Sequence, residues 1–145
     1  MWADLLGSPR WWASIATSGV LLRSRRAPSG TIGVMTRSAI AVDVYLALTD
    51  GTDARAPGGA VTVALCGHWE HDGPCRWPHN SRINAGSHPV RLRIVLVVPD
   101  DERAEALGRV EAGLRGDSRW CVRSFGLSVI SADEEDLAKR LFRAT

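Results

Sequence analysis

Residues 66–80, with the sequence CGHWEHDGPCRWPHN, contain most of the side chains in this protein that could perform metal or thiol chemistry. Two of the three cysteines and three of the four histidines lie there, and the fourth histidine, His88, follows soon after. Thiolate and imidazole groups are the ligands that zinc prefers in proteins, and four of them hold a structural zinc ion in a tetrahedron. The clustering therefore predicts a zinc site within residues 66–88.

The preferred ligand set has two thiolates and two imidazoles, so that the thiolate charges balance the charge of the ion. Its members are Cys66, His71, Cys75 and His79, with His68 and His88 as alternates. The spacing contains no C-x2-C pair, which is the usual signature of a zinc knuckle. Two other interpretations stay open: a solvated loop in which these residues crowd by chance, and a disulfide between Cys66 and Cys75.

The same segment also has residue types that bind partners. Trp69, Arg76 and Trp77 combine flat aromatic rings with a guanidinium group, and these types are common anchors of protein interfaces. Alternatively, one or both rings cover the hydrophobic core. The leading prediction is a small binding or interaction module with a structural zinc site and no catalytic residue. The alternative is a small metal- or thiol-dependent enzyme, in which Cys75 beside His71 or His79 is the nucleophile.

Composition limits the class of protein. The chain has 145 residues, of which 45% are hydrophobic and 23% charged, as in a soluble protein with one domain. Arginine outnumbers lysine by 17 to 1, which suggests GC-rich bacterial coding. Residues 38–145 carry 13 basic and 15 acidic side chains, so no strong nucleic-acid signal is present. The odd number of cysteines favours a reducing cytoplasm over a secreted disulfide scaffold.

Residues 1–37 differ from the rest of the chain. They carry five arginines and a single acidic residue, Asp4. Their apolar stretch, residues 11–22, is shorter than the roughly 20 residues that a transmembrane helix needs. We expect either a disordered extension or an over-long gene start whose true beginning is near Met35, followed by a single domain over residues 38–145.

The patterned part of the chain predicts four strands and two helices. Alternating apolar residues indicate strands near 40–48, 61–66, 90–98 and 120–130, and they place Cys121 on a buried face. Helices are expected after Pro99 and after the capping box that runs from Ser131 to Glu134. The order β-β-β-α-β-α predicts an α+β two-layer sandwich, with a four-stranded mixed sheet and two helices on one face. The first two strands would form a hairpin, and the last strand–helix–strand unit a parallel crossover.

Overall fold

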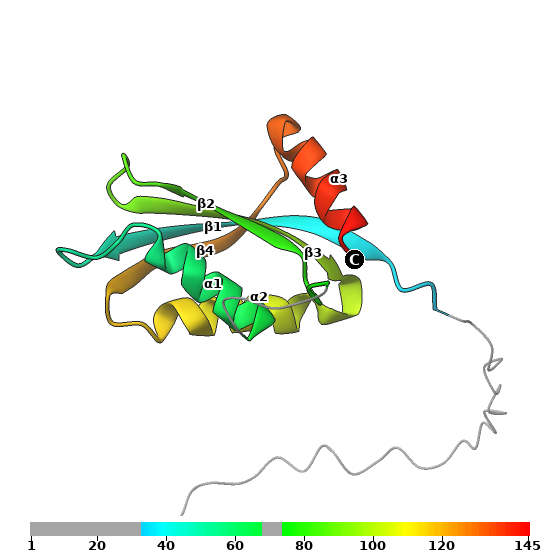
Figure 1. Cartoon of the computed structure of the whole chain (residues 1–145), viewed down its shortest axis with the longest axis horizontal. Helices are drawn as coiled ribbons and strands as arrows, with labels where there is room; N and C mark the ends of the chain where they lie inside the picture. Colours follow the sequence, from blue (N-terminus) through cyan, green and yellow to red (C-terminus); the bar gives the residue numbers. More distant parts are fainter. Residues whose placement is uncertain (1–32, 68–73) are drawn as a thin grey trace, which may run out of the picture. The chain divides into compact units, whose positions relative to one another are not determined.

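The structure is a computed structural model that describes residues 33–67 and 74–145, which Figure 1 draws in colour. An antiparallel sheet forms its centre, and helices lie on both faces of this sheet. The strands are β1 (Arg37–Leu48), β2 (His79–Asn84), β3 (Val90–Pro99) and β4 (Trp120–Ser128). The helices are α1 (Ala56–Cys66), α2 (Arg103–Arg115) and α3 (Glu135–Arg143), with short 3-10 turns η1 (Asp100–Glu102) and η2 (Ala132–Glu134) before α2 and α3.

The strands lie in the order β2-β3-β1-β4, and each neighbouring pair is antiparallel. The predicted α+β class and the four-stranded sheet are therefore confirmed, but the sheet is antiparallel and not mixed, and the described residues form three α-helices instead of two. Strands β3 and β4 do run parallel to each other, as the predicted crossover requires, but β1 lies between them. The order β-α-β-β-α-β up to β4 is the split arrangement of ferredoxin-like domains, to which this chain adds α3.

The predicted strand over residues 61–66 is wrong, because these residues form the second half of α1. Pro57 lies in the first turn of this helix, where a missing amide hydrogen costs nothing. Pro57, Val61 and Leu65, which are spaced four apart, face the core, whereas Val63 is 47% exposed. The predicted hairpin between the first two strands is therefore absent, and β3 pairs with β1 on one side and on the other with β2, which lies inside the predicted ligand loop.

Helices α1 and α2 cover one face of the sheet, and α3 lies on the opposite face (Figure 1). Alternate residues of β1 and β3 point toward α1 and α2 and form the main core with them. These core residues include Val42, Val44 and Leu46 of β1, Leu92, Ile94 and Leu96 of β3, Val61 and Leu65 of α1, and Val110 and Leu114 of α2. The two helices that were expected on one face, α2 and α3, therefore lie on opposite faces.

Ion pairs hold α3 against β3. Arg93 on β3 donates to both carboxylate oxygens of Glu134, at 2.9 and 2.6 Å, and also to Asp43 on β1 at 2.9 Å. The predicted capping box is confirmed, because Glu134 also accepts from the backbone amide of Ser131 at 3.0 Å. One buried carboxylate therefore both starts the final helix and attaches it to the sheet.

Strand β4 has an irregularity that changes which of its residues face the core. The pairing with β1 shifts between Tyr45 and Leu46, so that Arg123 is an extra residue on β4. A bulge of this kind moves every following side chain to the other face of the sheet. Trp120 is consequently buried, and Cys121 is exposed, which corrects the prediction that Cys121 lies in the core.

None of the helices in the described ranges is long and apolar enough to cross a membrane.

Candidate metal centre

Helix α1 ends at the first candidate ligand. Cys66 is its last residue, and Gly67 follows in the left-handed conformation, with φ 81°. The amide of Gly67 donates to the carbonyl of Val63 at 2.8 Å, which closes the final turn. A glycine after the last helical residue is the commonest way to end a helix. This ending directs Cys66 toward the start of β2.

Trp77 fixes the backbone between the other two candidate ligands. Its side chain is fully buried in the core, and its indole N–H donates to Glu102 at 2.7 Å. The carbonyl oxygen of Trp77 accepts from the Cys75 thiol at 3.4 Å and lies 3.0 Å from Nδ1 of His79. Trp77, predicted as a partner contact, therefore corresponds to the alternative in which the ring covers the core.

The structure brings Cys66, Cys75 and His79 together. One ligand atom from each residue lies within 4.8 Å of the other two, and all three residues are half-buried. Both thiols are free, and their sulfur atoms are 2.7 Å apart. Tetrahedral zinc with bonds of about 2.3 Å to sulfur would hold two thiolates about 3.8 Å apart. Binding an ion therefore requires the two sulfurs to separate by about 1 Å.

The surroundings of His79 suit a neutral metal ligand. If Nδ1 donates to the carbonyl of Trp77, the lone pair of Nε2 is directed away from that bond. Nε2 lies 3.3 Å from the hydroxyl of Thr62, which is one helical turn before Cys66 on α1. A ligating histidine commonly has its other ring nitrogen fixed by a carbonyl in this way.

The Cys66 thiol is half-buried beside the Cys75 thiol, and this position changes its acidity. Burial, which is the largest cause, together with the hydrogen bond and the negative charge of Cys75 raises the pKa of the Cys66 thiol to about 12. Cys66 is therefore protonated at neutral pH when no ion is bound. A metal ion must displace that proton, so its affinity rises with pH. The same raised pKa makes Cys66 a poor nucleophile, because the thiolate is the reactive form.

A cavity of about 320 Å³ lies beside the two cysteines. Leu65, Pro74 and Arg109 are among the described residues that line it. The cysteines are therefore not sealed inside the core, and an ion or a small molecule has a place beside them.

Other predicted site residues fall into two groups. His88 lies in the turn between β2 and β3, at the far end of β2 from His79, and a five-residue strand step spans about 17 Å. His88 is therefore not brought to the cluster. His68, Trp69 and His71 lie outside the described residues.

Thr62 is a residue beside the cluster that the sequence alone did not indicate. Its i,i+4 spacing from Cys66 is informative only once residues 56–66 are assigned to a helix.

Arg76 is the residue of the predicted partner surface that is both described and exposed to solvent. Its side chain is 52% exposed and pairs with Glu102 of η1 at 3.1 Å and with Glu105 of α2 at 3.4 Å. Its guanidinium also lies 4.3 Å from the centre of the Trp77 ring. Arg76 thus covers the buried tryptophan and still presents half of its surface to solvent.

Replacing Gly67 with alanine should destabilise the end of α1. An added methyl group would meet no atom of the described residues within 4 Å, so the expected cost comes from the left-handed backbone conformation. We expect a loss of about 1 kcal/mol in the free energy of unfolding, measured by urea denaturation. Gly108→Ala is the matched control, because Gly108 is inside α2, also in open space, and should gain stability. Equal effects at both positions would contradict this account.

No protein-family model matches this chain, and no curated protein matches it either. The case for a metal site therefore depends on the geometry of Cys66, Cys75 and His79 and on the chemistry of these residue types.

Proposed function

We propose that Cys66, Cys75 and His79 bind a zinc ion with a structural role in a small binding module. The observation that supports this proposal is that their three ligand atoms lie within 4.8 Å of one another. Thiolate and imidazole ligands favour zinc over magnesium or calcium, which prefer oxygen. The ion would join the end of α1 to the start of β2. The sequence predicts His71 as the fourth ligand, with His68 as the alternate.

A structural ion at this place would compensate for a weak helix. Helix α1 begins with the sequence APGG and also contains β-branched valine and threonine. Its proline, glycine, valine and threonine residues all have lower helix propensity than alanine. Its first turn has no acidic residue and its last turn no basic residue to interact with the helix dipole. Coordination by Cys66 would fix the C-terminal end of this helix.

Elemental analysis of the protein purified under reducing conditions tests the proposal directly. We expect about one zinc ion per chain, because one tetrahedral site holds one ion. Cys66→Ser, Cys75→Ser and His79→Ala should each lose most of the zinc. Cys121→Ser and His88→Ala are matched controls that should retain it, because neither residue belongs to the cluster. The proposal fails if reduced wild-type protein binds no zinc, or if the controls lose as much as the cluster variants.

Chelation should also lower stability. A ligand that binds only the folded state adds about 4 kcal/mol when its concentration is a thousand times its dissociation constant. The melting temperature should therefore fall on chelation, and Cys75→Ser should show no such change. Because the Cys66 pKa is about 12 without an ion, the shift caused by zinc should grow between pH 6 and pH 8.

The second candidate is an enzyme that uses the same cluster, and the cavity beside the cysteines favours it. Catalytic zinc sites keep three protein ligands and an open position for water, and a set of two cysteines and one histidine is a known example. His68→Ala and His71→Ala distinguish the two candidates. Loss of zinc in either variant supports the closed structural site. Full zinc content in both, with a bound water seen by X-ray absorption, supports the enzyme.

The location and partner follow from the same proposal. Free thiols that hold zinc require a reducing compartment, so we place the protein in the bacterial cytoplasm. The exposed half of Arg76, together with Trp69, would contact a protein partner next to the ion. Cross-linking to a partner that Arg76→Ala abolishes and Arg55→Ala leaves intact would support this surface, because Arg55 is also exposed.

A further inference from the structure

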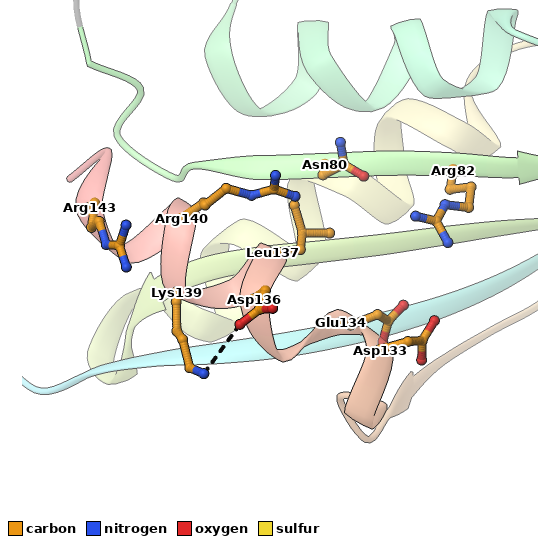
Figure 2. A pocket seen from close by; sticks show the side chains of 9 residues that line it. All are labelled: Asn80, Arg82, Asp133, Glu134, Asp136, Leu137, Lys139, Arg140 and Arg143. Atoms are coloured by element: carbon orange, nitrogen blue, oxygen red, sulfur yellow. Dashed lines mark hydrogen bonds and ion pairs between the residues drawn. The ribbon is translucent and has the colours of Figure 1, made fainter.

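A groove lies between β2 and α3, on the face of the sheet away from the metal cluster. Its volume is about 360 Å³. Asn80 and Arg82 extend into it from β2, while Leu137 and Arg140 extend from α3, as Figure 2 shows. His79 faces α1 instead, because successive residues of a strand point to opposite faces. The groove and the metal cluster therefore use opposite faces of β2.

Basic groups in this groove outnumber the acidic groups that are available to pair with them. Four basic side chains line it, and so do three acidic ones. Two of the acids are already paired: Glu134 bonds to Arg93 at 2.6 Å, and Asp136 pairs with Lys139 at 3.3 Å. The remaining charged groups are Arg82, Arg140, Arg143 and Asp133.

Within the described part of the chain, Arg82, Arg140 and Arg143 form no ion pair. Arg140 and Arg143 are in the last turn of α3, where the helix dipole favours positive charge. No such effect explains Arg82, which lies directly opposite Arg93 on the neighbouring strand. Like charges at opposed positions destabilise a sheet. Arg93 is already paired with Asp43 and Glu134, so Arg82 is the member of this opposed pair for which the described residues supply no counter-ion, and a bound anion would supply one.

We propose that the groove binds a small molecule through a phosphate group. Guanidinium groups present two parallel N–H donors that match the oxygens of a phosphate, and Asn80 adds an amide donor. The volume suits a small ligand, and Leu137 supplies an apolar contact for its non-phosphate part. A nucleic acid fits less well, because residues 38–145 carry a net charge of −2, from 13 basic and 15 acidic side chains.

Calorimetric titration of the protein with inorganic pyrophosphate tests this proposal. We expect saturable binding with a dissociation constant below about 1 mM. Arg82→Ala and Arg140→Ala should each weaken binding by a factor of about 10 to 100, as expected for a charge-assisted hydrogen bond. Arg123→Ala is the matched control, because Arg123 is an exposed arginine on β4 outside this groove. Asp133→Asn should strengthen binding, because it removes the one unpaired negative charge from the groove.

Pyrophosphate also binds zinc, so the location of binding needs its own control. The double variant C66S/C75S should bind pyrophosphate as tightly as the wild type does. This outcome is independent of the proposed zinc site, and loss of binding in the double variant would overturn the groove as the site. The proposal is also overturned by an absence of saturable binding, by an equal loss in Arg123→Ala, or by tight binding of an acidic peptide with no binding of pyrophosphate.

Discussion

Replacing Trp77 with alanine should destabilise this protein more than any substitution on its surface. The side chain of Trp77 is fully buried, and truncation of a buried tryptophan costs about 3–5 kcal/mol. The arginines Arg76 and Arg109, whose guanidinium carbons lie 4.3 and 5.1 Å from the ring centre, would lose that contact as well. The measurement is the free energy of unfolding in urea. Because domains of this size are stable by only about 5–15 kcal/mol, the loss should be a large share of the total.

The same substitution should weaken metal binding, although Trp77 is not a ligand. Its carbonyl oxygen is the common partner of Cys75 and His79, and its buried ring holds that carbonyl in place. Trp120→Ala is the matched control, since Trp120 is also buried and its indole also donates a hydrogen bond, here to Leu114 at 2.8 Å. Both variants should lose stability, but only Trp77→Ala should lose zinc affinity under conditions where both are folded. Unchanged stability in Trp77→Ala would show that its ring is a surface contact.

The misassigned segment 56–66 shows why periodicity alone did not identify α1. Val61 and Leu65 fit a strand, with Val63 between them, and fit equally well a helix in which residues four apart share a face. The residues that favoured a strand, valine and threonine, are β-branched, and APGG suggests a turn. Packing decided the outcome, because α1 lies against α2 closely enough that a methyl group on Gly113 would meet Ala64 at 3.0 Å.

Two other differences have local causes that a single sequence does not display. Strand β2 has the sequence HNSRIN, in which Ile83 is the only strongly apolar residue, so its hydrophobic pattern does not indicate a strand. It is a strand because its backbone pairs with β3 at the edge of the sheet. The bulge at Arg123 reversed the expected face of Cys121, and no glycine or proline marks it. In contrast, β1, β3 and α2 were predictable, because each has long regular periodicity or clear helix ends.

The candidate site was partly predictable. Cys66, Cys75 and His79 could be chosen from residue type and clustering alone, and among the described residues they are the ones whose ligand atoms lie within 4.8 Å of one another. The sequence favoured His79 over His88 but kept His88 as an alternate, because what excludes His88 is the hairpin that carries the two histidines to opposite ends of β2. It also left open whether Trp77 contacts a partner or covers the core, because an aromatic residue among polar neighbours has the same sequence pattern in both cases, and the structure buries the ring.

The attachment of α3 should depend on pH through one carboxylate. The hydrogen bonds from Arg93, which are the largest cause, and those from Ser131 together lower the pKa of Glu134 from 4.5 to about 2, against the effect of burial, which alone would raise it. A carboxylate whose pKa is lower in the folded state stabilises the fold at every pH above its unfolded value. This contribution is lost as the pH falls from about 4.5 to about 2. A pKa difference of this size between the unfolded and folded states corresponds to about 3 kcal/mol in the free energy of unfolding.

Glu134→Gln should therefore lower the free energy of unfolding at pH 7 by about 3 kcal/mol, and the difference from wild type should shrink toward zero as the pH approaches 2. Glu135→Gln is the matched control, because Glu135 is the next residue, exposed, and loses the same charge. Its stability should follow that of the wild type within a few tenths of a kcal/mol at every pH, as is usual for surface substitutions. Urea denaturation from pH 2 to pH 7 measures all three proteins. Parallel curves for the two variants would mean that net charge, and not the Arg93–Glu134 pair, holds α3 to the sheet.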